Sequence, residues 1–177
     1  MCKTKIVVLR YGHRPSRDKR ISTHLALVAR AFGAHEAWFD TKDESLERKI
    51  AKVNETFGGS FFVKTGIDLV SAIEGAKKKG YCVVHLTMYG IPLPQVIEEI
   101  RNKDKVLVLV GGPKVPRYFY EVADYNVSIT NQPHSEVAAV AVFLDWLYKG
   151  EEFNFKFKGG RIEIEPCNRG KRVKVLR

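Results

Sequence analysis

The fold is decided by the stretch Val106-Leu107-Val108-Leu109-Val110, which runs straight into Gly111-Gly112. A short, uninterrupted run of β-branched and leucine side chains between polar segments is typical of a strand that is buried on both faces. Both faces of a strand are buried where helices cover both sides of a parallel sheet. The run therefore predicts the centre of a parallel α/β sheet.

Working outward, short apolar runs alternate with segments of helical periodicity along most of the chain. Strands are predicted at 6–9, 37–39, 61–64, 81–86, 106–110 and 126–130. Helices are predicted at 21–32, 45–57, 68–79, 94–102, 115–122 and 135–148. Because parallel strands need crossover helices to reconnect them, this alternation predicts a mostly parallel sheet with helices on both faces.

The pattern changes after Gly150, where strict alternation of apolar and polar residues replaces the helical period. The alternating apolar positions are Phe153, Phe155, Phe157, Ile162 and Ile164. Gly159-Gly160 between them predicts a hairpin turn, and Val173 and Val175 could add a third strand. We therefore expect an α/β domain over residues 1–150 and a basic β-hairpin extension over residues 151–177.

The charge is distributed unevenly along the chain. The 177 residues carry a net charge of +10, of which residues 1–20 hold +6 and residues 151–177 hold +4, so that the middle of the chain is neutral. Two basic ends around a neutral body indicate a polyanionic partner such as nucleic acid. Solubility alone is the alternative explanation.

Several classes of protein are excluded or disfavoured. Cys2, Cys82 and Cys167 form no C-x-x-C pair, which argues against a zinc site or a disulfide framework. No apolar stretch reaches the roughly 20 residues needed to span a bilayer, and no signal-peptide pattern is present. Dinucleotide-binding and P-loop enzymes lack their glycine motifs here. We expect a cytoplasmic protein without metal or membrane association.

Ligands of open α/β sheets bind beyond the carboxyl ends of the strands, so the loops after the strands are the candidate sites. Thr87–Gly90, Gly111–Lys114 and Asn131–Glu136 follow three predicted strands, although Gly-Gly-Pro is also an ordinary turn sequence. The loop R-Y-G-H-R-P-S-R-D-K-R at Arg10–Arg20 has a different character, because arginine side chains bind phosphate bidentately. A merely solvated loop is the alternative.

Histidines are the other candidates for chemistry. His13 lies in the basic loop and could serve as a general base or as a phosphate contact. His24 and His85 adjoin apolar residues and are predicted to be core histidines with satisfied hydrogen bonds.

Five strings together resemble the archaeal tRNA ribose 2′-O-methyltransferases that modify cytidine 56 in the TψC loop, a branch of the SPOUT class. The strings are the basic loop just quoted, A-R-A-F-G-A at Ala29–Ala34, H-L-T-M-Y-G at His85–Gly90, G-G-P-K-V-P at Gly111–Pro116, and Y-N-V-S-I-T-N-Q-P-H-S-E-V-A-A at Tyr125–Ala139. The resemblance implies a carboxyl-terminal trefoil knot, a homodimer, tRNA as substrate and S-adenosyl-L-methionine as methyl donor.

Position by position, the resemblance implies three cofactor-binding segments. They comprise Leu86, Thr87, Met88, Tyr89 and Gly90, then Gly111, Gly112, Pro113, Lys114 and Val115, and finally Ile129, Thr130, Asn131, Gln132, Pro133, His134, Ser135 and Glu136. These segments contain the three loops that the strand pattern already selects.

The chain departs from the wider methyltransferase class at the position of the usual catalytic arginine, which is Leu27 here. We therefore expect Arg20 to act at the target ribose, with Arg14 and Arg17 as phosphate clamps. RNA contacts are predicted for His13, Lys19, Lys171, Arg172 and Lys174. The alternatives are a non-catalytic RNA-binding protein of the same fold, which the missing arginine favours, and a nucleotide-dependent metabolic enzyme.

Overall fold

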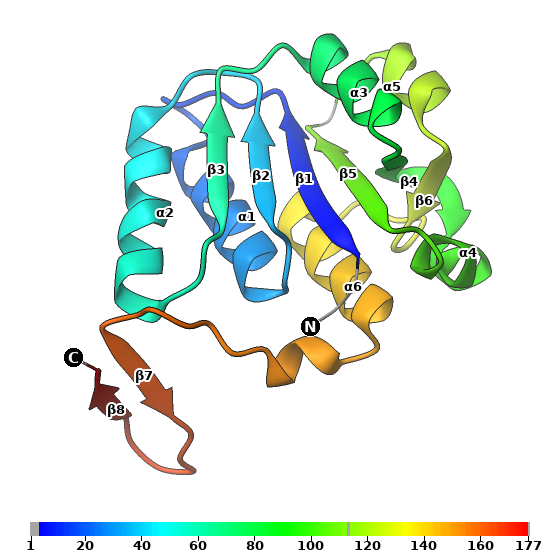
Figure 1. Ribbon diagram of the computed structural model, residues 1–177. Helices are drawn as coiled ribbons and strands as arrows, with labels where there is room; N and C mark the ends of the chain where they lie inside the picture. Colours follow the sequence, from blue (N-terminus) through cyan, green and yellow to red (C-terminus); the bar gives the residue numbers. More distant parts are fainter. Residues whose placement is uncertain (1–3, 113, 177) are drawn as a thin grey trace.

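A single six-stranded parallel sheet organises the computed structural model, which describes residues 4–112 and 114–176 (Figure 1). Its strands run in the order β3-β2-β1-β5-β4-β6. They are β1 (Lys5–Tyr11), β2 (Glu36–Phe39), β3 (Phe62–Thr65), β4 (Cys82–Pro92), β5 (Lys105–Gly111) and β6 (Tyr125–Ser128). The predicted central strand is confirmed, because β5 lies between β1 and β4 and Val106–Val110 is fully or nearly fully buried.

Helices cover the two faces of the sheet unequally. The helices are α1 (Lys19–Ala31), α2 (Glu44–Phe57), α3 (Leu69–Lys78), α4 (Ile97–Arg101), α5 (Arg117–Val122) and α6 (Glu136–Tyr148), with short 3-10 turns η1 (Leu93–Gln95) and η2 (Glu151–Asn154). One core lies under α1, α2 and α6 and contains Phe39, Ile50 and Phe143. The second core lies under α3 and α5 and contains Ile73 and Phe119. In Figure 1 no helix lies in front of β2 and β3, so this part of the second face is open.

Strand β4 is longer than predicted because it resumes after an interruption. Leu86 and Ile91 both pair with Val127 of β6, so the four residues from Thr87 to Gly90 bulge out of the ladder between them. A bulge leaves its residues unpaired and redirects their backbone, so this segment is a loop even though it lies within a strand. The predicted helix at 94–102 is also split, since Val96, with φ −126°, separates η1 from α4.

The prediction for the carboxyl-terminal hairpin is partly wrong. Residues 151–157 contain no strand; the antiparallel pair is β7 (Ile162–Glu165) with β8 (Arg172–Val175). Two of the three phenylalanines, Phe155 and Phe157, contact the body of the protein, whereas Phe153 is 81% exposed. Phe155 lies edge-on to Tyr148 with ring centroids 5.3 Å apart, and the Arg30 guanidinium lies 4.6 Å above the Phe157 ring.

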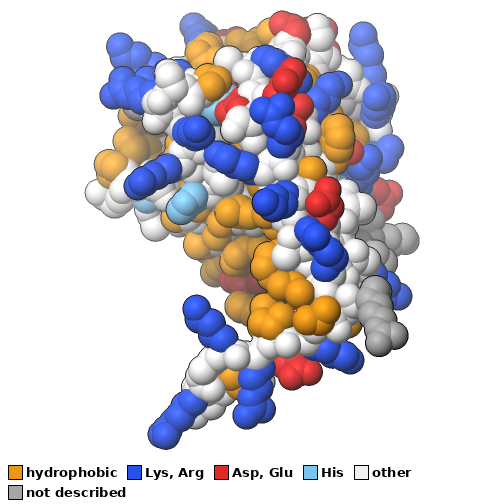
Figure 2. Space-filling model, turned by 90° about the vertical axis from the view of Figure 1, so that its left-hand side faces the viewer, with side chains coloured by type: hydrophobic (Ala, Val, Ile, Leu, Met, Phe, Trp, Pro, Cys, Tyr) orange, Lys and Arg blue, Asp and Glu red, His pale blue; other side chains and the backbone are white. Residues whose placement is uncertain are grey.

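Residues 155–161, which we call the strap, connect the body of the protein to the hairpin. The amide of Gly59 donates to the carbonyl of Lys158 at 2.8 Å, and the amide of Arg161 donates to the carbonyl of Thr56 at 3.0 Å. Beyond the strap, the hairpin projects past the amino ends of the strands (Figure 1). Figure 2 shows Lys and Arg side chains on this projection and at the opposite end of the same face, with hydrophobic side chains between them.

The two faces of the hairpin differ in chemistry. Glu163 faces Lys174 and Glu165 faces Arg172 across the strands, so opposite charges are paired in register. The other positions of the two strands are apolar, and Val175 is 77% exposed. An isolated two-stranded hairpin is marginally stable in water, so this apolar face is a candidate contact surface.

The packing at the end of α1 generates a stability prediction. Gly33 has φ +86°, and a Cβ added there would lie 2.3 Å from the Phe155 ring. Gly80 has φ +81° and nothing within 4 Å of an added Cβ. Gly80→Ala should lower the free energy of unfolding by roughly 1–2 kcal/mol, the cost of left-handed backbone for alanine. Gly33→Ala should cost clearly more, because it also displaces Phe155. Urea unfolding measures the free energy of unfolding of both variants. Equal losses would show that the contact between Phe155 and Gly33 does not stabilise the protein.

Candidate active site at the carboxyl ends of the strands

Four loops meet at the carboxyl edge of the sheet. The arginine loop (residues 10–20) runs from the end of β1 into the first turn of α1. We call residues 86–90, 111–115 and 129–136 the first, second and third ligand loops. Tyr11 is in register with Gly111, so the arginine loop begins beside the second ligand loop. The structure therefore brings together the loops that the sequence selected.

The first and third ligand loops are in direct contact. Asn131 Nδ2 donates to the carbonyl oxygens of Met88 at 2.7 Å and Gly90 at 3.2 Å. Gly90 approaches β6 so closely that an added Cβ would lie 2.5 Å from the backbone of Asn126 and Val127. Only glycine fits there, so the glycine of the H-L-T-M-Y-G string is required by packing.

The second ligand loop leaves open space beside the sheet. An added Cβ at Gly111 would meet Val115 at 2.9 Å, whereas nothing described lies within 4 Å of one at Gly112. Lys114 is exposed, and Pro113 lies outside the described residues. A ligand could therefore approach the backbone of Gly112 without a side chain in the way.

Arg10, the first residue of the arginine loop, points into the protein. It is 3% exposed and binds Glu136 bidentately, with Nε to Oε2 at 2.6 Å and Nη2 to Oε1 at 3.3 Å. Its Nη1 donates to Ser22 Oγ at 3.1 Å and lies 3.6 Å from Asp18 Oδ2. The arginine thus joins β1 to the first turn of α6, where the third ligand loop ends.

His13 continues this buried network. Its Nδ1 lies 2.7 Å from Ser22 Oγ and its Nε2 lies 3.1 Å from Asp43 Oδ2. The ring is 2% exposed, so the predicted contact of His13 with RNA is wrong: the side chain is enclosed. Ser22 is also fully buried, so this serine, histidine and aspartate do not present a nucleophile to a substrate.

Two aspartates between β2 and α2, Asp40 and Asp43, hold the arginine loop in place. The Asp40 carboxylate accepts from the amides of Gly12 at 2.8 Å and His13 at 2.9 Å. Asp43 caps α2 by accepting from the amide of Leu46 at 3.0 Å. Burial alone would raise the pKa of Asp43, but the hydrogen bonds from Leu46 and His13 lower it on balance. Neither aspartate was predicted as a site residue, although Asp43 stands where a helix N-cap is expected.

The remaining basic residues of the loop face solvent. Arg14 Nε lies 3.0 Å from Asp18 Oδ2, and this hydrogen bond is the main reason that the pKa of Asp18 is lowered. Among the described residues, the side chains of Arg17 and Arg20 form no hydrogen bond or ion pair. Arg17, Lys19 and Arg20 are exposed cations beside the ligand loops, whereas Arg14 forms an ion pair with Asp18.

Other predicted site residues have structural partners or lie elsewhere. Ser135 caps α6 by accepting from the amide of Ala138 at 3.0 Å, and His134 is exposed. Lys171, Arg172 and Lys174 lie on the hairpin, at the opposite end of this chain from the ligand loops (Figure 1).

The two predicted core histidines differ. His85 is buried, its Nδ1 lies 2.9 Å from Asn126 Oδ1, and burial lowers its pKa. His24 is exposed, so the prediction is wrong for that residue: the neighbouring apolar residues face the core while His24 lies on the outer face of α1.

The described residues contain no group of three or more His, Cys, Asp or Glu side chains that could hold a metal ion. Within the same residues, no helix is long and apolar enough to cross a membrane.

Comparison with known families and proteins gives a consistent result. The model of a family described as "tRNA ribose 2'-O-methyltransferase, aTrm56" matches residues 57–174. A tRNA (cytidine(56)-2'-O)-methyltransferase of Staphylothermus marinus is 55% identical, over 97% of this chain and 94% of that protein. One of Thermoplasma volcanium is 56% identical over 97% of this chain, which spans only 50% of that protein's length.

Solved structures resemble this fold at low sequence identity. An RNA 2'-O ribose methyltransferase has a TM-score of 0.63 at 16% identity, covering 85% of this chain and 58% of that chain. The SpoU methyltransferase AviRb of Streptomyces viridochromogenes, solved with the cofactor AdoMet, has a TM-score of 0.58 at 14% identity, covering 84% and 61%. The predicted α/β fold class is confirmed, while the threading of the knot stays a prediction.

A double-mutant cycle measures the buried pair. Arg10→Met and Glu136→Met should each lower the free energy of unfolding by about 3–5 kcal/mol, because each leaves its partner charge largely enclosed and unpaired. The double variant should lose much less than the sum of the two. The control pair Arg117 and Glu121, which is exposed on α5, should show coupling near zero. Additive losses for Arg10 and Glu136 would contradict a tight pair.

Proposed function

The chain belongs to the tRNA ribose 2′-O-methyltransferase family aTrm56, and from this premise we propose that it methylates the ribose 2′-hydroxyl of cytidine 56 in the TψC loop of tRNA. The observation that carries the proposal is the 55% identity with a relative of that name over nearly the whole of both chains. The exposed arginines beside three converging ligand loops support it, because the reaction needs a ribose 2′-hydroxyl next to a methyl donor and arginines can hold the phosphates that flank that ribose.

We propose S-adenosyl-L-methionine as the methyl donor, and the residues present fit such a group. Gly112 leaves its backbone accessible, and the buried Ser128 Oγ at the end of β6 has no hydrogen-bond partner among the described residues. Open backbone amides and carbonyls in the three ligand loops would hold an adenine edge, a ribose and a carboxylate. When bound, the cofactor supplies an electrophilic methyl group on sulfur.

The residues of this chain would orient and polarise the RNA. A ribose 2′-hydroxyl is a weak nucleophile, so negative charge that develops on its oxygen must be stabilised. The arginine guanidinium has hydrogen-bond donors and no acceptor, so Arg20 would stabilise that charge and the adjoining phosphate, and the hydroxyl proton would pass to solvent water. Arg17 would hold a second phosphate. Arg14 could do so only by exchanging Asp18 for RNA.

The buried network would position these groups. Arg10 and Glu136 tie the arginine loop to the end of the third ligand loop, so the guanidinium groups and the cofactor segments keep one relative placement. Correct placement of reacting groups is itself a large part of catalysis.

The homodimer and the cytoplasmic location stay predictions. Exposed apolar side chains on α6, namely Val142 at 38% and Trp146 at 41%, support a second copy as partner.

The direct test is methyl transfer to RNA. The protein, labelled S-adenosyl-L-methionine and unmodified archaeal tRNA should yield 2′-O-methylcytidine at position 56. Arg20→Ala should lower kcat by about 100-fold or more, the size reported for removing one preorganised donor to a developing oxyanion. Its affinity for tRNA should fall only slightly. Arg48→Ala on α2 is the control and should leave both quantities unchanged, since Arg48 is exposed and Glu44 is its single partner among residues 4–112 and 114–176.

Two outcomes would contradict this proposal. If the wild-type protein binds tRNA but transfers no methyl group to any RNA, the protein is a non-catalytic RNA-binding member of the fold. If Arg20→Ala retains full turnover, another group acts at the ribose.

We further propose that the hairpin binds the tRNA backbone. Combined replacement of Lys171, Arg172 and Lys174 by Ala should weaken tRNA binding and lower the slope of log K against log salt by about 2–3. Affinity for S-adenosyl-L-methionine should not change. Glu163→Gln with Glu165→Gln should instead strengthen tRNA binding, because it removes the opposing charges. If both combined variants leave tRNA affinity unchanged, the cross-strand charges only hold the hairpin together.

A further inference from the structure

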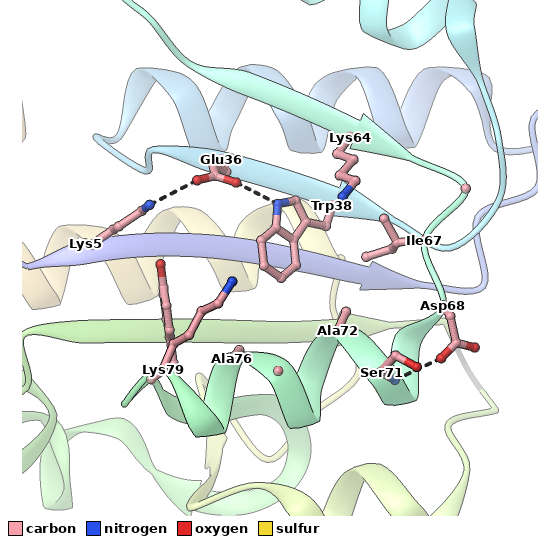
Figure 3. A pocket seen from close by; sticks show the side chains of 13 residues that line it. Lys5, Glu36, Trp38, Lys64, Ile67, Asp68, Ser71, Ala72, Ala76 and Lys79 are labelled. Atoms are coloured by element: carbon pink, nitrogen blue, oxygen red, sulfur yellow. Dashed lines mark hydrogen bonds and ion pairs between the residues drawn. The ribbon is translucent and has the colours of Figure 1, made fainter.

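A groove of about 600 Å³ lies on the open face of the sheet, between β2, β3 and α3 (Figure 3). Trp38, Ile67, Ala72 and Ala76 form its apolar surface, and Lys5, Lys64 and Lys79 lie around it. The groove is on the face opposite α1 and α6, and its lining includes no residue of the ligand loops. It is therefore a separate surface from the candidate active site.

The indole of Trp38 is fixed in the groove. Its Nε1 donates to Glu36 Oε2 at 2.9 Å, and the other oxygen of that carboxylate binds Lys5 Nζ at 3.2 Å (Figure 3). The ring therefore keeps one orientation without a ligand, so ligand binding would not lose free energy by ordering this side chain. A partly exposed tryptophan held in this way is a flat surface available for stacking.

Three lysines and two carboxylates line the groove, namely Lys5, Lys64 and Lys79 against Glu36 and Asp68, so its charge is +1. Glu36 is neutralised by Lys5, and Asp68 is engaged as the N-cap of α3, accepting from the amide of Ser71 at 2.8 Å. Within the described part of the chain, Lys64 and Lys79 form no ion pair through their ammonium groups. Phe62, on the same face of the edge strand as Lys64, is 58% exposed and extends the aromatic surface.

We propose that this groove is a second RNA-binding site, which stacks an unpaired tRNA base on Trp38 and holds the adjoining phosphates with Lys64 and Lys79. The inference rests on the proposed function, since it takes tRNA as the ligand. An open sheet face with an aromatic side chain and flanking lysines has the chemistry that binds single-stranded RNA: bases stack on the ring and the cations follow the backbone. At Ile67 and Asp68 the groove reaches the carboxyl edge of the sheet, where the arginine loop begins.

Tryptophan fluorescence gives a direct readout. The chain has two tryptophans, so Trp146→Phe leaves Trp38 as the single reporter. Titration with unmodified tRNA should quench its fluorescence and protect it from acrylamide. Trp38→Ala should weaken tRNA binding about fivefold or more, the lower end of the effect of losing one stacked base. Trp38→Phe, which keeps an aromatic face, should recover most of the affinity.

The lysines are tested separately because they are exposed and their loss should not affect folding. Lys64→Ala and Lys79→Ala should each lower the slope of log K against log salt by about 1. Lys52→Ala on α2 is the matched control and should change neither affinity nor slope. All variants should keep the wild-type kcat at saturating tRNA, because the groove lies away from the ligand loops.

The outcomes separate this proposal from the proposed function. Unchanged tRNA affinity and no quenching, in a protein that methylates tRNA, would overturn the groove proposal alone. Weakened tRNA binding by the groove variants, in a protein without methyl transfer, would support the groove while overturning the proposed function. A fall in sedimenting mass for Trp38→Ala, with tRNA affinity unchanged, would show that a second copy of the chain occupies the groove instead.

Discussion

The buried pair of Arg10 and Glu136 is the interaction on which the arrangement of the loops depends. Removing two charges from water costs several kcal/mol for each ion, and this cost is offset only where every donor finds an acceptor. Each of the three guanidinium nitrogens of Arg10 donates to Glu136 or Ser22, and Nη1 also lies 3.6 Å from Asp18 Oδ2. Because these partners come from α1, its N-cap and α6, the pair is satisfied only when those elements take their places around the end of β1.

This requirement divides one basic string into two groups of residues. Arg10, His13 and Asp18 are buried and serve the structure, whereas Arg17, Lys19 and Arg20 face solvent beside the ligand loops. The outward residues can attract RNA because the inward ones hold the loop still. A loop that was merely solvated, the alternative considered from the sequence, would have no buried arginine and no carboxylate caps on its amides.

The strands and helices could be predicted because their signals are local. The run Val106–Val110 identifies a buried strand from its own composition, and each helix shows its period within a few residues. Arg10 and Glu136 are 126 residues apart, so no local pattern shows that one neutralises the other. The same limit explains the hairpin: alternation at Phe155 and Phe157 is correct as a pattern, but the residues that they meet, Tyr148 and Arg30, lie in other elements.

The net charge of +10 acquires a spatial meaning from the fold. The arginine loop lies at the carboxyl ends of the strands and the hairpin lies beyond their amino ends. The two basic segments therefore lie at opposite ends of the folded molecule (Figure 1). A compact anion could bind only one of them, whereas a nucleic acid is long enough to reach both. Since α3 and α5 leave β2 and β3 uncovered, the open face with Trp38 and Lys64 offers such a ligand a surface within the otherwise neutral body.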